Sequence, residues 1–154
     1  MTNYYCLVTG LPELSLEDGK LSYTVANFKT EIYPELSKAD KKLVDLFYLK
    51  FDNRNLLTLL KDKEASVDTS LGNYSADELL SVIASIKEET APDKKFPAYF
   101  YEFAELYLNT PDEERWGLED KLHGFYYNHA MKSGNPFVSA WFELNLDVNN
   151  ILAA

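Results

Sequence analysis

The chain has 154 residues, of which 46% are hydrophobic, and this is enough to bury a proper core, so we expect one helical domain over residues 1–154. Its net charge of −10 and its pI near 4.6 argue against nucleic acid or an anionic membrane surface as the main ligand, because both require a basic patch. Cys6 has no second cysteine to pair with, which favours a reducing compartment. No apolar stretch approaches the roughly 20 residues of a membrane span, and the N-terminus lacks a signal-peptide pattern. We therefore expect a cytoplasmic protein in a reducing compartment.

The first half of the chain shows the apolar spacing of helices. Apolar residues recur every three or four positions at Val25, Phe28, Ile32 and Leu36. Pro34 is expected to end or kink this first helix. Ser37 then provides a cap-like start for a helix that is predicted to be the longest, from about Ala39 to Glu64. Residues 65–74 are polar and are predicted to form a loop.

The second half contains further start and stop signals. Ser75 opens a helix with capping-box spacing, and residues 90–97 break that helix. After an aromatic helix, another is predicted over about residues 111–132, with Gly134 as its stop. The last helix begins at Pro136 and forms an antiparallel hairpin with the one before it. No alternation typical of strands spans the chain, so the predicted fold class is all-α, with long antiparallel helices.

One segment of the chain occurs twice. Leu46–Leu59 reads LFYLKFDNRNLLTL, Trp141–Ala154 reads WFELNLDVNNILAA, and five of the fourteen aligned positions are identical. The identical pairs are Phe47/Phe142, Leu49/Leu144, Asp52/Asp147, Asn55/Asn150 and Leu57/Leu152. Repetition at long spacing indicates duplicated units, so we predict a first helical unit over about residues 15–95 and the start of a second over about 96–154. Because the last helix has no C-terminal cap, we also expect a truncated fragment of a larger pseudo-symmetric protein built from repeated helical units.

The repeat places the pattern Asp-x-x-Asn in line with apolar residues. Residues four apart share a helical face, so Asn55 and Asn150 fall in apolar rows. A buried asparagine must find hydrogen-bond partners or it costs roughly 1–3 kcal/mol. We predict that both asparagines are buried and hydrogen-bonded, whereas Asn53 belongs to another face and matters less. The pattern is interpreted first as a structural clamp and second as a direct contact with a partner. The motif residues are Asp52, Asn55, Leu56, Asp147, Asn150 and Ile151.

No group of residues forms a recognisable catalytic, cofactor-binding or metal-binding pattern. His123 and His129 are six positions apart, do not share a helical face and have no cysteine in metal-ligand spacing. The acidic run over residues 112–114 is interpreted as a complement to a helix dipole, and no glycine-rich phosphate loop is present. Cys6 lies in no local motif of a nucleophile. We therefore predict no enzyme activity, no cofactor and no metal.

The repeated segment resembles a helix of a known family. The stretch LFYLKFDNRNLLTLLKDK is similar to the central-stalk socket protein of V/A-type rotary ATPases, which has prokaryotic and eukaryotic forms. The residues at the matching positions are Asp52, Asn55, Leu56, Leu59, Leu60 and Lys61. At the position of Lys61 the family commonly has arginine. AWFELNLDVNNILAA resembles the same motif through Asp147, Asn150 and Ile151. The stretches NYYCLVTGLPEL and TVANFKTEIYP look closer still to a divergent bacterial family of uncharacterised proteins, whose genes lie beside V-type ATPase genes.

The resemblance implies an architecture and a function. The family is built from such helical units with pseudo-threefold symmetry, and it is a non-catalytic adaptor that links the axle subunits to the membrane ring. It would lie in the cytoplasm, peripheral to the inner membrane through protein partners. Two alternatives stay open, a free-standing helical scaffold for unrelated proteins and an enzyme whose site is completed by a missing C-terminal part. As a fragment, the chain is expected to self-associate through residues 137–154, and binding of axle and ring is expected to need all the units.

Overall fold

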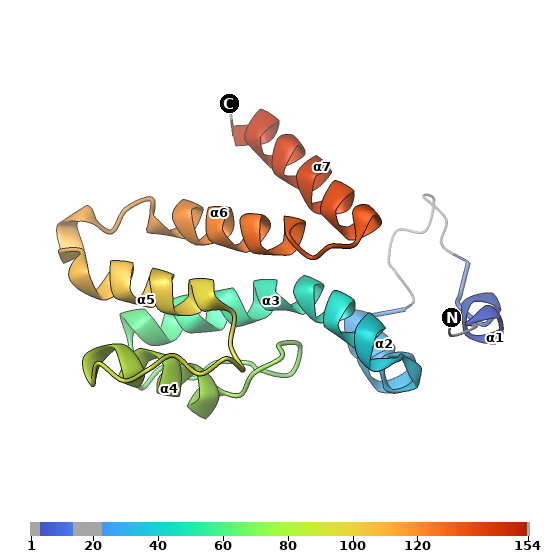
Figure 1. Cartoon of the computed structure of the whole chain (residues 1–154), viewed down its shortest axis with the longest axis horizontal. Coiled ribbons are helices and arrows are strands. Elements are labelled where there is room, and N and C mark those ends of the chain that lie inside the picture. Colours follow the sequence, from blue (N-terminus) through green and yellow to red (C-terminus); the bar gives the residue numbers. More distant parts are fainter. Residues whose placement is uncertain (1–3, 14–22, 154) are drawn as a thin grey trace.

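The computed structural model describes residues 4–13 and 23–153, which form helices and turns without strands, so the predicted all-α class is confirmed. The elements are α1 (Tyr5–Thr9), α2 (Val25–Glu31), the 3₁₀ turn η1 (Tyr33–Glu35), α3 (Lys38–Lys61), α4 (Ala76–Lys87), α5 (Ala98–Asn109), the 3₁₀ turn η2 (Asp112–Glu114), α6 (Leu118–Met131) and α7 (Pro136–Ala153). Figure 1 shows α3 at the centre, with α4 along one side and α5 and α6 along the other. Within the described ranges, no helix combines the length and the apolar character that crossing a bilayer requires.

α3 is the central helix. The side chain of Ser37 accepts a hydrogen bond from the backbone N of Asp40 at 3.2 Å, so the cap-like start signal is confirmed. α3 is also the longest of the described helices, as predicted, although it ends at Lys61. From Tyr48 onward it is buried on several sides, because α4, α5 and α6 all contact it. It therefore carries much of the core and holds the first copy of the repeat.

α4 and α5 complete the core around α3. Ser75 and Glu78 cap the start of α4 reciprocally, which confirms the predicted capping box. α5 supplies aromatic side chains, of which Phe100 and Phe103 are fully buried. The innermost side chains of the core are Leu56, Leu59, Leu79, Val82, Ile83, Phe100, Phe103 and Leu122. Part of the aromatic richness of the sequence is thus explained by packing.

The segment before α6 differs from the prediction. One helix is predicted over about residues 111–132, but the chain makes only the short turn η2 before α6 starts, directly after Gly117. Gly117 has a φ of +78°, a left-handed conformation that interrupts a helix. Arg115 fixes this break, because its Nε donates to the carbonyl oxygens of Tyr107 at 3.2 Å and Thr110 at 2.9 Å.

α7 forms a splayed hairpin with α6. Gly134 follows the end of α6 with a φ of +76°, and Asn135 Oδ1 accepts from the backbone N of Val138 at 3.1 Å, which caps α7. The ring of Phe142 packs against that of Phe47, with centroids 5.0 Å apart, and joins α7 to α3. Figure 1 shows α7 leaving the other helices near this hairpin and pointing away from them. Only the first half of α7 is therefore well packed.

The N-terminal residues attach to the start of α3. Tyr4 OH donates to Asp40 Oδ2 at 2.6 Å and accepts from the backbone N of Ser37 at 2.7 Å. The predicted start of the first unit, near residue 15, lies outside the described residues. The division into two repeat units stays a prediction.

Candidate functional site

The first copy of the repeat holds a loop against α3. Asp52 is 0% exposed, and its two carboxylate oxygens accept from the backbone N of Asn73 at 2.9 and 3.0 Å. One of them also accepts from the backbone N of Tyr74 at 3.1 Å. Asn55 is buried, as predicted, and its Nδ2 donates to the backbone carbonyl of Asp68 at 2.8 Å. Both contacts join α3 to the loop that precedes α4, so in this copy the motif is a structural clamp.

Burial and hydrogen bonding act on Asp52 in opposite directions. Burial raises the pKa of its carboxyl group from 3.8 to about 6, although the backbone hydrogen bonds and the charge of Lys29 lower it. Lys29 donates to the carbonyl of Gly72 and so joins α2 to the same loop. A Cβ atom added at Gly72 would overlap Asp52 Oδ1 and lie 3.2 Å from its Cγ. The clamp therefore requires both the acid at 52 and the glycine at 72.

The second copy of the repeat has a different environment. Asp147, Asn150 and Ile151 are all exposed on α7, so the prediction that Asn150 is buried is wrong. The reason is that α6 is the main neighbour of α7, whereas three helices surround α3. Asn149 makes a contact instead, and its Nδ2 donates to Tyr127 OH at 2.7 Å. The same pattern is a clamp in α3 and a solvent-facing set of side chains in α7.

An apolar stripe covers the outer face of α7. We call it the α7 outer stripe, and it consists of Phe137, Trp141, Leu144, Val148 and Ile151. The residues are spaced alternately four and three apart, the heptad pattern by which one helix packs along another. All are exposed, Phe137 at 71% and Ile151 at 75%. Single exposed apolar side chains are ordinary, but a continuous apolar surface marks an interaction site. The four-and-three spacing is a local pattern of the sequence, and the repeat contributes Leu144 and Ile151 to it.

The whole chain matches one family. The family model described as protein of unknown function (DUF2764) matches residues 1–154. The chain belongs to this family. No curated protein and no solved structure matches the chain. Both the Asp52 clamp and the α7 outer stripe lie inside the region that the family model covers.

A groove adjoins the α7 outer stripe between α3, α6 and α7. Its volume is about 460 Å³, its lining is mostly aromatic and amide side chains, and Trp141 belongs to both surfaces. Asn53 lines it and is only 3% exposed, which corrects the expectation that its face matters little. Its Oδ1 accepts from Tyr99 OH at 2.7 Å, whereas its Nδ2 has no hydrogen-bond partner among the described residues. This Nδ2 atom is shielded from solvent, so the missing hydrogen bond is a cost of packing around α3 and not a group offered to the groove.

The other polar residues singled out in the sequence are dispersed. His123 is exposed on α6, and the ring of His129 lies 5.3 Å from that of Tyr99. Burial, with a contribution from Lys132, lowers the pKa of His129, so its imidazole is neutral at pH 7. Cys6 is exposed. Among the residues that the structure describes, no three His, Cys, Asp or Glu side chains are grouped to hold a metal ion.

Proposed function

We propose that this protein is a non-catalytic helical adaptor that binds another protein through the α7 outer stripe. The observation that carries the proposal is the heptad spacing of five exposed apolar residues from Phe137 to Ile151. A surface of this kind is stable in water when a second helix covers it. The neighbouring groove extends the surface, because Trp141 belongs to both and the groove adds aromatic and amide side chains to the area that a partner can contact.

The occupant we propose is a partner helix that carries a matching apolar stripe flanked by basic residues. The charged residues of α7 are Glu143 and Asp147, both acidic, and the chain has a net charge of −10. Two copies of α7 would therefore bring like charges together and repel each other, whereas a basic partner would be attracted by the negative charge of α7. Charge thus favours a different protein over a second copy of this chain as the occupant.

We further propose that the partners are subunits of a V/A-type rotary ATPase. The support is the resemblance of the segment around Asp52 and Asn55, and of its second copy at Asp147 and Asn150, to the central-stalk socket family. In that role the protein links the axle subunits to the membrane ring and lies at the cytoplasmic side of the inner membrane through these contacts. The clamp fixes the helical framework, and the α7 outer stripe makes the contact.

A co-purification experiment tests both parts of the proposal. The protein is tagged and expressed in the organism from which it comes, and it is purified in mild detergent. The proteins that are purified together with it are identified by mass spectrometry. We expect axle and ring subunits in the wild-type sample, and their loss in a Leu144→Lys, Val148→Lys variant. The matched control is Trp116→Lys, at an apolar residue that is 86% exposed outside α7.

The outcomes separate the alternatives. Absence of ATPase subunits from the wild-type sample would remove the socket role, and retention of one unrelated protein through α7 would indicate a free-standing scaffold. Equal retention by the wild type and the α7 variant would rule out the outer stripe as the contact. A dimer in light scattering that Leu144→Lys dissociates would make a second copy the occupant, in place of a basic partner helix.

A further inference from the structure

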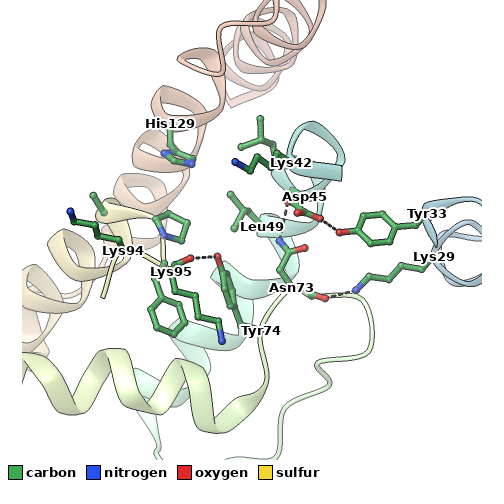
Figure 2. Close-up of a pocket in the computed structure, with 15 residues that line it drawn as sticks. Lys29, Tyr33, Lys42, Asp45, Leu49, Asn73, Tyr74, Lys94, Lys95 and His129 are labelled. Atoms are coloured by element: carbon green, nitrogen blue, oxygen red, sulfur yellow. Dashed lines mark hydrogen bonds between the residues drawn. The ribbon is translucent and has the colours of Figure 1, made fainter. Parts of the chain in front are cut away.

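A second cleft gathers positive charge in this acidic protein. It has a volume of about 650 Å³ and lies between α2, the first half of α3, the 72–74 turn, the start of α5 and the end of α6, as Figure 2 shows. Four lysines line it against a single acid: Lys29, Lys42, Lys94, Lys95 and Asp45. The whole chain has 25 acidic and 15 basic side chains, so the balance inside the cleft is the reverse of the balance outside it.

The one acid of the cleft does not neutralise these lysines. Asp45 Oδ1 accepts a hydrogen bond from Tyr33 OH at 2.6 Å, which occupies one side of its carboxylate. Lys95 forms its ion pair with Glu78, a residue outside the lining. Among the residues that line the cleft, the other three lysines therefore have Asp45 as their one carboxylate, and the buried carboxylate of Asp52 also offsets part of the charge of Lys29.

Those three lysines have no ion-pair partner in the described part of the chain. Lys29 donates to the backbone carbonyls of Ser70 and Gly72, which carry no net charge. Burial lowers the pKa of the Lys29 amine, although the charges of Asp52 and Asp45 act against this. In Figure 2 the amine of Lys42 is directed across the cleft toward the His129 ring. Positive charge is thus available on more than one side of the cleft.

The remaining walls are flat or apolar. Tyr74 and Phe96 lie on one side with their ring centroids 5.0 Å apart, and Leu49 lies on the floor formed by α3. His129, which is neutral at pH 7, can donate or accept a hydrogen bond. Ala98 begins α5 with no side-chain cap, so the positive end of that helix dipole adds to the field of the lysines.

We propose that this cleft binds a small polyanion with a flat, apolar body, of the organic phosphate class. The lysines would hold the phosphate groups, and the aromatic walls would hold the ring system. The volume lies within the roughly 300–1,000 Å³ of small-molecule sites. A long polyanion such as nucleic acid does not fit the proposal, because the surface outside the cleft is acidic and repels it.

Calorimetric titration tests the proposal with three probes, ADP in the presence of EDTA, pyrophosphate and adenosine. ADP should bind best, because it has both the charge and the flat ring, and adenosine should not bind measurably. The variant Lys42→Glu, Lys94→Glu should weaken ADP binding by about tenfold or more, because each change replaces attraction by repulsion. The matched control is Lys63→Glu, Lys121→Glu, at exposed residues outside the cleft that give the same change in net charge. It should alter ADP affinity by about twofold at most, because distant charges are screened.

Several results would overturn the proposal. One is the absence of any heat of binding with millimolar ADP, and another is adenosine that binds as tightly as ADP. A third is ADP binding that is weakened equally by the cleft variant and by the control variant. Pyrophosphate binding as tightly as ADP would refute a role for the aromatic walls. Circular dichroism of both variants would establish that they are folded, as expected for substitutions of exposed side chains.

Discussion

Replacing Gly72 by alanine should disrupt the contact between α3 and the loop before α4. The new Cβ would overlap Asp52 Oδ1. An exposed carboxylate could move aside, but Asp52 is fully buried and is held by the backbone N–H groups of Asn73 and Tyr74. Gly72 is not in the left-handed region, so backbone strain makes no contribution and the contact with Asp52 decides the outcome.

The magnitude follows from the hydrogen bonds that must be broken. The carboxylate accepts at 2.9 and 3.0 Å from Asn73 and at 3.1 Å from Tyr74. A hydrogen bond to a charged group contributes about 1.5–3 kcal/mol, and a shift of the carboxylate or the loop weakens at least one of them. We therefore expect Gly72→Ala to lower the free energy of unfolding by about 2–4 kcal/mol.

Urea denaturation followed by circular dichroism measures this change. The control is Gly124→Ala, where the added Cβ meets nothing within 4 Å in the middle of α6, and where alanine should raise stability by about 0.5–1 kcal/mol. In an Asp52→Ala background the cost of Gly72→Ala should vanish, because the overlapping atom is gone. A Gly72→Ala variant as stable as the wild type, or a cost that persists without Asp52, would refute the reasoning.

Three further changes test the polar contacts. Asp52→Asn should remove a pH dependence of stability. The folded protein keeps the proton of Asp52 up to about pH 6, whereas the unfolded chain releases it near 3.8. Wild-type stability should therefore fall relative to the variant by about 2.4 kcal/mol from pH 4 to pH 7 in urea titrations, and a pH-independent difference would contradict this. Asn55→Leu should lower the free energy of unfolding by about 1–3 kcal/mol, because Asn55 is buried and hydrogen-bonded. Asn150→Leu should lower it by less than about 0.5 kcal/mol, because Asn150 is exposed, and equal melting shifts would count against the clamp. Tyr99→Phe should cost about 1–2 kcal/mol because it leaves Asn53 Oδ1 buried without its donor, while Tyr127→Phe, at an exposed hydrogen bond to Asn149, should shift the urea midpoint little.

Local signals in the sequence were sufficient for most of the helices. Ser37 and Ser75 cap α3 and α4 as predicted, because a cap depends on atoms within one helical turn. The prediction of a helix through Gly117 is wrong because the chain there is broken by two features that depend on how α5 and α6 meet. These are the left-handed backbone of Gly117 and the contacts of Arg115 with carbonyl groups. Local spacing alone does not contain that information.

The two copies of the repeat show where sequence reasoning about a site reaches its limit. Asn55 and Asn150 have nearly the same neighbours in sequence, yet one is buried and the other exposed. The difference arises from which helices surround α3 and α7, which is a property of tertiary packing. Asn53 was missed for the same reason, since its burial depends on Tyr99 from α5. The α7 outer stripe can be recognised from the sequence, because heptad spacing is a local pattern.

The splayed position of α7 also determines where the protein opens first. After Phe142 most of its side chains are exposed, and a helix of this length without tertiary support is marginal in water. Amide hydrogens in its last turns should therefore exchange at low protection while those of α3 exchange only on global unfolding. A partner that covers α7 must first immobilise a fraying segment, so part of the interaction energy goes into ordering it. The affinity at this surface should consequently be lower than its apolar area alone would suggest, and the complex correspondingly quick to dissociate.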